Sequence, residues 1–298
     1  MTSIAFIGAG KVGTALAVKL AQQGYPVVAV ASRSVSSAER LASLIPGCRP
    51  YLTPQEAADA AELVFITTPD DVIPQMACQV AWRPDHGVVH CSGADSASIL
   101  DPARERGAQV GVFHPLQTLA SLEEALENLP GSTFSIEAQG SLLESLKEMA
   151  TALEGRWIVL RAEDRVLYHA AAVIVCNYLV TLMKMATDLW QFFGVSPQEA
   201  TSALLPLVRG TVHNLETVGL PMCLTGPIAR GDLGTVAKHL EALRERAPQF
   251  LPTYRELGLQ TIPIALAGGR IDAQQGRRME EVLRGMEMVG SEGKKGLT

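Results

Sequence analysis

The first 160 residues alternate short apolar runs with segments of helical spacing, and this alternation limits the fold more than any other feature. The apolar runs, rich in β-branched residues, fall at residues 3–7, 26–34, 62–69, 87–93, 108–115, 133–138 and 157–160. Strands alternating with helices are typical of βαβ units, which build a parallel sheet. Because βαβ crossovers are nearly always right-handed, the pattern predicts a doubly wound, mostly parallel α/β sheet.

After residue 160 the pattern becomes helical. A long apolar segment is followed by further segments of helical spacing, at residues 169–193, 197–218, 234–247, 250–266 and 273–286. We therefore predict a first domain over residues 1–160, a second, all-helical domain over residues 161–290 and a flexible tail over residues 291–298. The long apolar segment raises the question of a membrane span. His169, Asn177, Lys184 and Asp188 interrupt it, so we favour a helix buried in a domain core or a dimer interface.

Charge and cysteine usage exclude several classes of protein. The net charge is −6, which is not the basic footprint of a nucleic-acid-binding protein. The five cysteines are widely spaced and odd in number, which argues against a disulfide framework or a zinc site. No basic region precedes the first strand, so we expect no signal peptide, and a cytoplasmic location is the prediction.

The first predicted strand runs directly into a glycine-rich turn that opens a helix. The turn has the GxGxxG spacing and reads Gly8-Ala9-Gly10-Lys11-Val12-Gly13. In this context the glycines allow a tight turn, close approach to a pyrophosphate and close packing of helix on strand. Free N–H groups at the helix N-terminus favour phosphate. The alternative is a glycine-rich turn without a ligand.

The end of the second predicted strand indicates which dinucleotide binds. NAD-binding proteins place an acidic residue there, on the ribose hydroxyls. This chain instead has Ser32, Arg33 and Ser34. A guanidinium can clamp a 2′-phosphate, and the two hydroxyls can add hydrogen bonds, so NADP is the predicted cofactor. The alternative for Arg33 is a solvated surface charge.

A third group of cofactor candidates follows the run at residues 62–66. Thr67, Thr68 and Pro69 lie at the expected carboxyl end of a central strand, beside the ligand crevice. Asp70 and Asp71 come next, and we expect them to cap the following helix.

Two later strands end in residues suited to acid–base chemistry. Ser92 follows one strand, and His114 ends the next, with Gln117 a few residues on as a substrate-binding candidate. A histidine there could donate a proton to a carbonyl or imine as a hydride reaches carbon, and Ser92 could hydrogen-bond it or the substrate. The alternative for His114 is a structural histidine. For His90, within its strand, the structural role is favoured.

The helical half offers further candidates. His169 and Asn177 lie eight residues apart, roughly on one helix face, and can contact substrate, nicotinamide or a dimer partner. Thr225 and Arg230 could hold a carboxylate; the alternative is a helix-connecting turn with Asp232 as N-cap. No residues suggest a metal site.

Several of these motifs carry a family resemblance. The strings GAGKVG, SRS, VVHCSGA, FHPLQT, YHAAAVIVCNYL and LTGPIARGD resemble bacterial proteins that join a Rossmann-like domain to the domain of unknown function 2520. That family is similar to pyrroline-5-carboxylate reductase and the 6-phosphogluconate dehydrogenase superfamily. The resemblance implies a Rossmann domain, then an all-α domain of the 6-phosphogluconate dehydrogenase C-terminal type that commonly builds a homodimer. It implies an oxidoreductase without supplying a substrate.

Two further comparisons bear on the catalytic hypothesis, and the first is a local resemblance only. Prephenate and arogenate dehydrogenases have a serine and a His-Pro pair that Ser92 and His114 resemble. The β-hydroxyacid dehydrogenases have a lysine one turn before an asparagine, but one turn before Asn177 this chain has Val173. The residue candidates for catalysis are therefore His114, Ser92 and Asn177.

The leading hypothesis is an NADP-dependent oxidoreductase of a small carbonyl, imine or hydroxy compound. Two alternatives stay open: a non-catalytic NADP(H)-binding regulator or sensor, and an imine reductase like pyrroline-5-carboxylate reductase. The expected partners are a small-molecule substrate and a second copy of the chain, with neither nucleic acid nor membrane.

Overall fold

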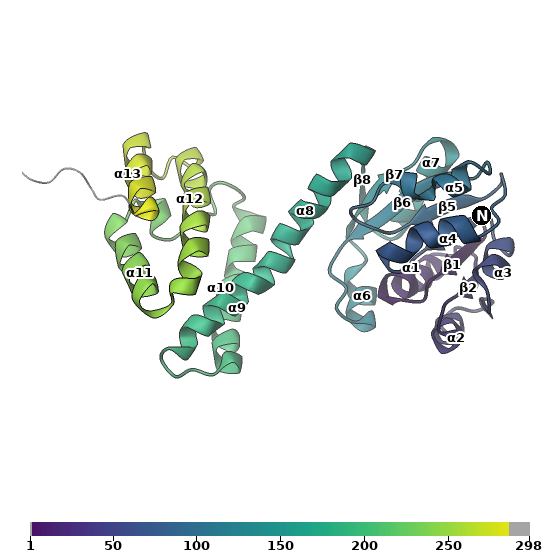
Figure 1. Cartoon of the computed structure of the whole chain (residues 1–298), viewed down its shortest axis with the longest axis horizontal. Helices are drawn as coiled ribbons and strands as arrows, with labels where there is room; N and C mark the ends of the chain where they lie inside the picture. Colours follow the sequence, from purple (N-terminus) through teal and green to yellow (C-terminus); the bar gives the residue numbers. More distant parts are fainter. Residues whose placement is uncertain (1, 286–298) are drawn as a thin grey trace, which may run out of the picture. The chain divides into compact units, whose positions relative to one another are not determined.

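The computed structural model describes residues 2–285, and the chain divides after Tyr178 into two compact units (Figure 1). The first unit extends beyond residue 160 because helix α8 (Arg165–Val175) sends side chains into the loop after β5 (Gly87–His90). The expected tail at residues 291–298 lies outside the described residues.

One sheet forms the centre of the first unit. Its strand order is β3-β2-β1-β4-β5-β6-β7-β8, and every neighbouring pair is parallel except β6 and β7. This confirms the predicted doubly wound, mostly parallel α/β sheet. The remaining strands are β1 (Ile4–Ile7), β2 (Val27–Ala31), β3 (Arg49–Tyr51), β4 (Leu63–Ile66), β6 (Gln109–Leu116), β7 (Thr133–Glu137) and β8 (Arg156–Val159). The apolar runs do not predict β3, which is a short strand with a proline; the edge of a sheet tolerates such a strand.

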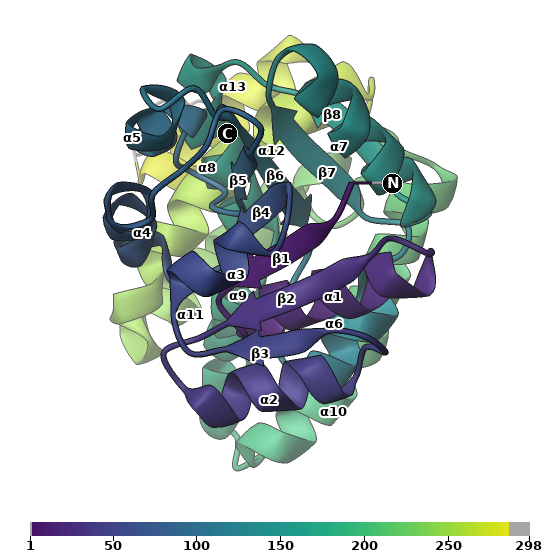
Figure 2. The same cartoon turned by 90° about the vertical axis from the view of Figure 1, so that its right-hand side faces the viewer.

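Helices cover both faces of this sheet (Figure 2). Alternate residues of β1 show the division: Ile4 and Phe6 pack with residues of α1, whereas Ala5 and Ile7 pack with α3 and α4. The helical elements of the first unit, besides α8, are α1 (Lys11–Gln22), α2 (Val35–Ser43), α3 (Pro54–Asp59), η1 (Asp70–Val72), α4 (Ile73–Gln79), η2 (Ala97–Leu100), α5 (Asp101–Arg104), α6 (Leu122–Asn128), α7 (Gly140–Ala152) and η3 (Ala162–Asp164).

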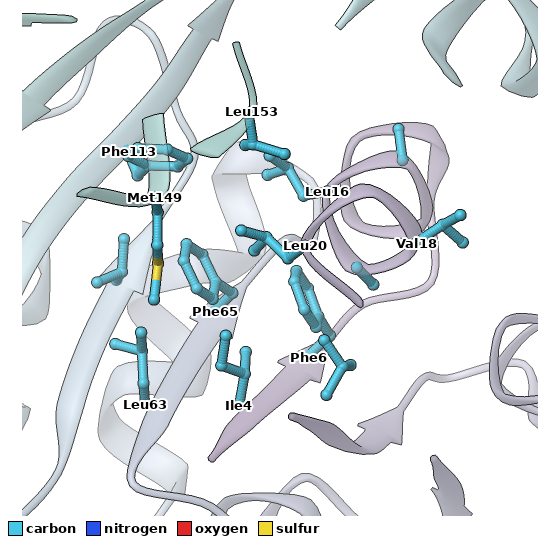
Figure 3. Close-up of a cluster of buried hydrophobic side chains, with 14 of the residues drawn as sticks. Ile4, Phe6, Leu16, Val18, Leu20, Leu63, Phe65, Phe113, Met149 and Leu153 are labelled. Atoms are coloured by element: carbon cyan, nitrogen blue, oxygen red, sulfur yellow. The ribbon is translucent and has the colours of Figure 1, made fainter. Parts of the chain in front are cut away.

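Aromatic side chains run across the α1 face of the sheet (Figure 3). Phe6 stacks on Phe65 with ring centroids 5.1 Å apart, Phe65 meets Phe113 edge-on at 6.0 Å, and Phe113 stacks on Phe134 at 4.6 Å. Such pairs add about 0.5–1.5 kcal/mol each beyond the burial of their area. They tie β1, β4, β6 and β7 together and so fix the strand ends that carry the candidate site.

The second unit is helical, as predicted. Its core forms where α11, α12 and α13 pack together through buried residues that include Val236, Ile262 and Met279. Helix α9 begins two residues before the division and continues into the second unit. The elements of this unit are α9 (Asn177–Gln191), α10 (Pro197–Thr217), η4 (Ile228–Arg230), α11 (Leu233–Arg246), η5 (Pro248–Phe250), α12 (Leu251–Ala267) and α13 (Ala273–Arg284).

The long apolar segment is helical and exposed. Residues 162–191 are long and apolar enough to cross a membrane by length and composition, and none of the apolar window is buried within the chain. Leu167 is 75% exposed and Val175 73%. This exposure contradicts burial in a domain core, which is the first of the two environments expected for this helix.

Candidate active site

The predicted glycine turn packs against the end of β4. Gly8 has a φ of +116°, and a Cβ there would lie 2.6 Å from the carbonyl carbon of Thr67. A Cβ on Gly13 would lie 2.3 Å from Thr67 Oγ1, which donates a 2.8 Å hydrogen bond to the carbonyl oxygen of Gly8. Glycine is thus required at both positions, as the motif predicts.

The first turn of α1 presents backbone rather than side chains. Gly10 is its N-cap and provides no side-chain hydrogen bond to the first N–H groups. Lys11 Nζ donates to the carbonyl oxygen of Ala120, and Val12 packs against the core. The N–H groups at this end of the helix are the groups suited to an anion.

A cleft of about 560 Å³ gathers most of the predicted cofactor residues. Its lining includes Gly8, Ala9, Gly10, Ser32, Arg33, Ser34, Thr67, Thr68 and Pro69. Arg33 is exposed and has no ion pair within residues 2–285. Thr68 Oγ1 is buried and lacks a hydrogen-bond partner. A free guanidinium, an unpartnered hydroxyl and a glycine cradle fit a dinucleotide with an added phosphate.

Ser34 also has a local structural role. Its Oγ accepts a 3.3 Å hydrogen bond from the N–H of Ser37 and caps α2. A ligand phosphate at Arg33 would therefore meet the start of this second helix as well.

Asp70 has a different role from the predicted one. The N-cap of η1 is Pro69, which offers no side-chain cap, and Asp70 Oδ2 instead accepts a 3.0 Å hydrogen bond from Ser92 Oγ. The carboxylate thus links the ends of β4 and β5 rather than capping a helix.

Buried His90 holds the loop after β5 from one side. The N–H of Ser92 donates to His90 Nδ1 at 3.1 Å, so Nε2 carries the hydrogen and donates to the carbonyl oxygen of Ser96, also at 3.1 Å. Burial lowers the pKa of His90 to about 4. His90 is therefore structural, as expected.

Buried Arg165 of α8 holds the same loop from the other side. Its side chain is 0% exposed. Nη2 donates to the carbonyl oxygens of Ser92 (2.9 Å) and Gly93 (3.3 Å), and Nε donates to that of Asp95 (2.6 Å). Glu137 Oε2 lies 3.8 Å from Nε and supplies the compensating charge. The loop that carries Ser92 is thus fixed by two buried side chains.

The hydroxyl of Ser92 is engaged by carboxylates. It lies 2.8 Å from Asp95 Oδ2 and 3.0 Å from Asp70 Oδ2, with one hydrogen to share between them. No hydrogen bond joins Ser92 to His114 among the described residues. Of the two roles suggested for Ser92, the hydrogen bond to His114 is not formed, because the carboxylates of Asp70 and Asp95 are closer and stronger acceptors.

His114, near the end of β6, lies beside three residues of the neighbouring elements. Its Nδ1 is 2.9 Å from the hydroxyl of Tyr168, and its ring centroid is 6.3 Å from that of His169. A Cβ on Gly93 would lie 2.9 Å from His114 Nε2 and 2.5 Å from His169 Cδ2. Burial, and to a smaller extent the positive charge of Arg165, lowers the pKa of His114 to about 4. The imidazole is therefore neutral at pH 7.

The other predicted site residues lie on separate elements of the two units. Gln117 Nε2 donates to the carbonyl oxygen of Asn128 at 3.0 Å, which gives it a part in holding its own loop. Asn177 is the exposed first residue of α9. Thr225 and Arg230 are exposed residues of the second unit, before α11. Asp232 accepts from the N–H of Thr235 at 2.9 Å and caps α11 as expected.

Four residues of this site are not among those predicted from the sequence: Arg165, Tyr168, Asp95 and Glu137. Arg165 and Tyr168 lie in the first turn of α8. A charged side chain and a phenol are unusual at the start of an apolar helix, and this is a signal in the sequence that could have identified them. Nothing in the spacing relates Glu137 to Arg165. Within residues 2–285 no cluster of three or more His, Cys, Asp or Glu residues could hold a metal ion.

Two family models match the chain. Residues 1–115 match the Rossmann-like domain, and residues 132–261 match the domain of unknown function DUF2520. These matches confirm the two-domain resemblance that the motifs predict. No curated protein matches the chain.

Solved structures show the same fold. A Thermotoga maritima protein is 25% identical with a TM-score of 0.72, over 89% of this chain and 98% of that chain. The "putative NADP oxidoreductase" of Bacteroides fragilis is 24% identical with a TM-score of 0.68, over 94% of this chain and 98% of that chain. A pyrroline-5-carboxylate reductase from Coxiella burnetii is 17% identical with a TM-score of 0.58, over 94% and 98%. These likenesses extend over both domains.

Proposed function

We propose that this chain, a Rossmann-like domain joined to a DUF2520 domain, is an NADP(H)-dependent oxidoreductase of a small carbonyl, imine or hydroxy compound. The observation that carries the proposal is that the glycine cleft and His114 belong to one unit, at the carboxyl ends of neighbouring strands. Ligands of doubly wound sheets bind at these strand ends.

The predicted cofactor residues fall into groups that would bind different parts of NADP(H). The glycine turn and the first N–H groups of α1 would hold the pyrophosphate. Arg33, with Ser32 and Ser34, would hold the 2′-phosphate, since no acidic residue stands there to accept ribose hydroxyls. Thr67, Thr68 and Pro69 line the same cleft on its β4 side. When bound, the nicotinamide supplies or accepts the hydride.

His114 is the proposed acid–base residue. Its Nε2 makes no hydrogen bond to other described residues, and Gly93 leaves that side of the ring without a Cβ. A neutral imidazole can polarise a carbonyl by hydrogen bonding, as well as exchange a proton with it. Ser92 and Asp95 of the loop after β5, with Asp70 after β4, form a hydrogen-bonded group that can orient the substrate or the nicotinamide. His169 is a proposed substrate contact because it borders Gly93, whereas Asn177, Gln117, Thr225 and Arg230 keep only the support of the sequence.

Titration calorimetry with NADPH and NADH at one salt concentration, followed by NADPH oxidation on carbonyl and imine panels, tests the proposal. We expect NADPH to bind more tightly and a substrate to be turned over. His114→Gln should keep NADPH affinity within about threefold and lower kcat by about 10²–10⁴-fold. His213→Gln, on the exposed surface of α10, is the matched control. NADPH binding without turnover on any panel would instead favour a sensor, and full activity of His114→Gln would remove His114 from the chemistry.

We also propose a cytoplasmic homodimer. Large apolar side chains stay exposed on α8, α9 and α10, among them Val166, Leu167, Val175, Val180 and Leu207. Helices with many exposed large apolar side chains are typical of an interface, and the resemblance favours a second copy as the partner. All five cysteines are free, which is consistent with a reducing compartment. Light scattering on the purified full chain should give twice the mass of the chain, and a monomeric mass at micromolar concentration would contradict the dimer.

A further inference from the structure

The hydrogen bond between His114 and Tyr168 joins the sheet to α8. The two rings meet edge-on, with centroids 5.7 Å apart and planes at 89°, and the hydroxyl lies 2.9 Å from Nδ1. Tyr168 is half-buried. The contact therefore fixes both the orientation of the imidazole and the surroundings of one of its nitrogens.

The relative acidity of the two groups determines whether Tyr168 or His114 donates this hydrogen bond. A phenol is a far stronger acid than the N–H of a neutral imidazole, and an imidazole nitrogen is a far stronger base than a phenol oxygen. The groups that face His114 are Tyr168, His169 and Arg165 from α8 and His90 from β5; Ser135 of β7 is its partner across the strand pair. Arg165 carries a fixed positive charge, which disfavours a second positive charge on the ring, so the ring stays neutral. Tyr168 therefore donates to Nδ1, and the single ring hydrogen lies on Nε2.

The Nε2 side of the ring faces the backbone of the loop after β5. A Cβ on Gly93 would lie 2.9 Å from Nε2, so glycine keeps this position open. The loop itself is held by Arg165 and His90. A reacting group bound beside this loop therefore meets an N–H and not a lone pair.

We infer that Tyr168 is a positioning residue that sets the substrate class: by keeping the hydrogen on His114 Nε2, it selects substrates whose reacting heteroatom has a free lone pair. Such substrates are ketones, aldehydes and neutral imines. The inference rests on the proposed oxidoreductase function.

The proton movements balance in the reductive direction. The nicotinamide hydride forms the new C–H bond while the C=O π pair moves to oxygen and takes the proton from Nε2. As Nε2 gives up its proton, the lone pair of Nδ1 takes the Tyr168 proton. When solvent returns a proton to Nε2, the Nδ1 proton goes back to the phenolate, which restores the starting tautomer. The net reaction consumes one hydride from NADPH and one proton.

One substrate can distinguish a loss of proton donation by His114 from a general loss of activity. The cation N-methyl-3,4-dihydroisoquinolinium has no lone pair on nitrogen and needs only a hydride, with no proton, to become a tertiary amine. Its reduction should not depend on the Nε2 hydrogen, whereas the reduction of a cyclic ketone should. Damage to the fold or to cofactor binding would slow both reactions alike.

The test compares wild type, Tyr168→Phe and the control Tyr254→Phe, using NADPH oxidation with the ketone and with the N-methyl iminium. Tyr254 makes the same type of pair, 2.8 Å from His239 Nδ1, in the second unit. We expect Tyr168→Phe to lower kcat on the ketone by at least about tenfold, to change the iminium rate by less than about twofold, and to leave KM for NADPH unchanged. Tyr254→Phe should change neither rate.

Equal loss on both substrates, or no loss on the ketone, would overturn the role of Tyr168 while leaving the oxidoreductase proposal intact. If wild type reduces neither substrate nor any other carbonyl or imine, the proposed function fails first. A readout independent of turnover is the long-range ¹H–¹⁵N spectrum of the labelled chain, with the His114 signals assigned by their loss in His114→Gln. The expected tautomer has its hydrogen on Nε2; a hydrogen on Nδ1 would overturn the inference directly.

Discussion

Arg165 Nη2 donates a 2.9 Å hydrogen bond to the carbonyl oxygen of Ser92, from a side chain with no exposed surface. The same guanidinium also donates hydrogen bonds to the carbonyl oxygens of Gly93 and Asp95. A buried charge that is held by several backbone carbonyl oxygens stabilises a loop only while those partners are present.

Arg165→Met should therefore be costly. It leaves buried carbonyl oxygens without donors and Glu137 without its cation, for an expected loss of about 3–5 kcal/mol in the free energy of unfolding of the first unit. Hydrogen exchange over residues 87–100 should accelerate in parallel. The control is Arg161→Met, an exposed residue paired with Asp164, which should leave that exchange unchanged. Unchanged exchange in Arg165→Met would show that the loop does not depend on the guanidinium.

Gly13→Ala tests the packing of the glycine turn. The new Cβ would lie 2.3 Å from Thr67 Oγ1 and 2.6 Å from the carbonyl oxygen of Gly8. Because a backbone oxygen cannot move away cheaply, we expect a loss of about 1–3 kcal/mol in unfolding free energy and at least about tenfold weaker NADPH binding. Gly210→Ala is the control: it is also a helical glycine, has nothing within 4 Å of the new Cβ, and should gain about 0.5–1 kcal/mol. Wild-type NADPH affinity in Gly13→Ala would contradict the predicted phosphate site.

The glycine motif was predictable from sequence because its chemistry is local. Six consecutive residues specify the turn, and the strand before and the helix after them confirm the context. The apolar runs likewise predicted β1, β2 and β4 to β8, since strands buried in a parallel sheet are nearly continuous apolar segments. The strand β3 escaped because three residues, one of them proline, carry no periodicity.

The histidine site was only partly predictable because its contacts are long-range. His114 stood out as a polar residue at a strand end, but its partner Tyr168 is 54 residues away. Asp70 illustrates the same limit. Its position after β4 favoured a helix cap, and its true partner Ser92 comes from another strand. Only the assembled sheet brings these strand ends together, so spacing along the chain could not reveal these hydrogen bonds.

Arg33→Asp should reverse the cofactor preference. Losing the charged hydrogen bonds to a 2′-phosphate costs about 1.5–3 kcal/mol, which corresponds to an NADPH affinity about 10–150-fold weaker. The new carboxylate can accept from ribose hydroxyls, so NADH binding should be equal or tighter. Arg40→Asp, an exposed residue of α2 outside the cleft, is the control for a general change of charge. Calorimetry with both dinucleotides measures all four values, and an equal loss of NADPH affinity in the two variants would mean that Arg33 acts only through net charge.

The neutral buried histidines should make the first unit sensitive to mild acid. Burial holds the pKa of His90 and of His114 at about 4, against an ordinary value of 6.5. Between these values the unfolded chain binds protons that the folded chain does not, so the free energy of unfolding falls as the pH falls from about 6.5 to about 4. Each histidine contributes up to roughly 3 kcal/mol to this loss.

His114→Gln isolates one of these contributions. Glutamine keeps a polar side chain but does not titrate, so the variant should lose less stability than wild type between pH 6.5 and pH 4, by an amount of up to roughly 3 kcal/mol. Urea unfolding at several pH values in this window measures the slope for wild type, His114→Gln and the exposed control His213→Gln. The control should follow wild type. If His114→Gln follows it too, the pKa of His114 is not lowered in the folded chain, and burial is not what keeps its imidazole neutral.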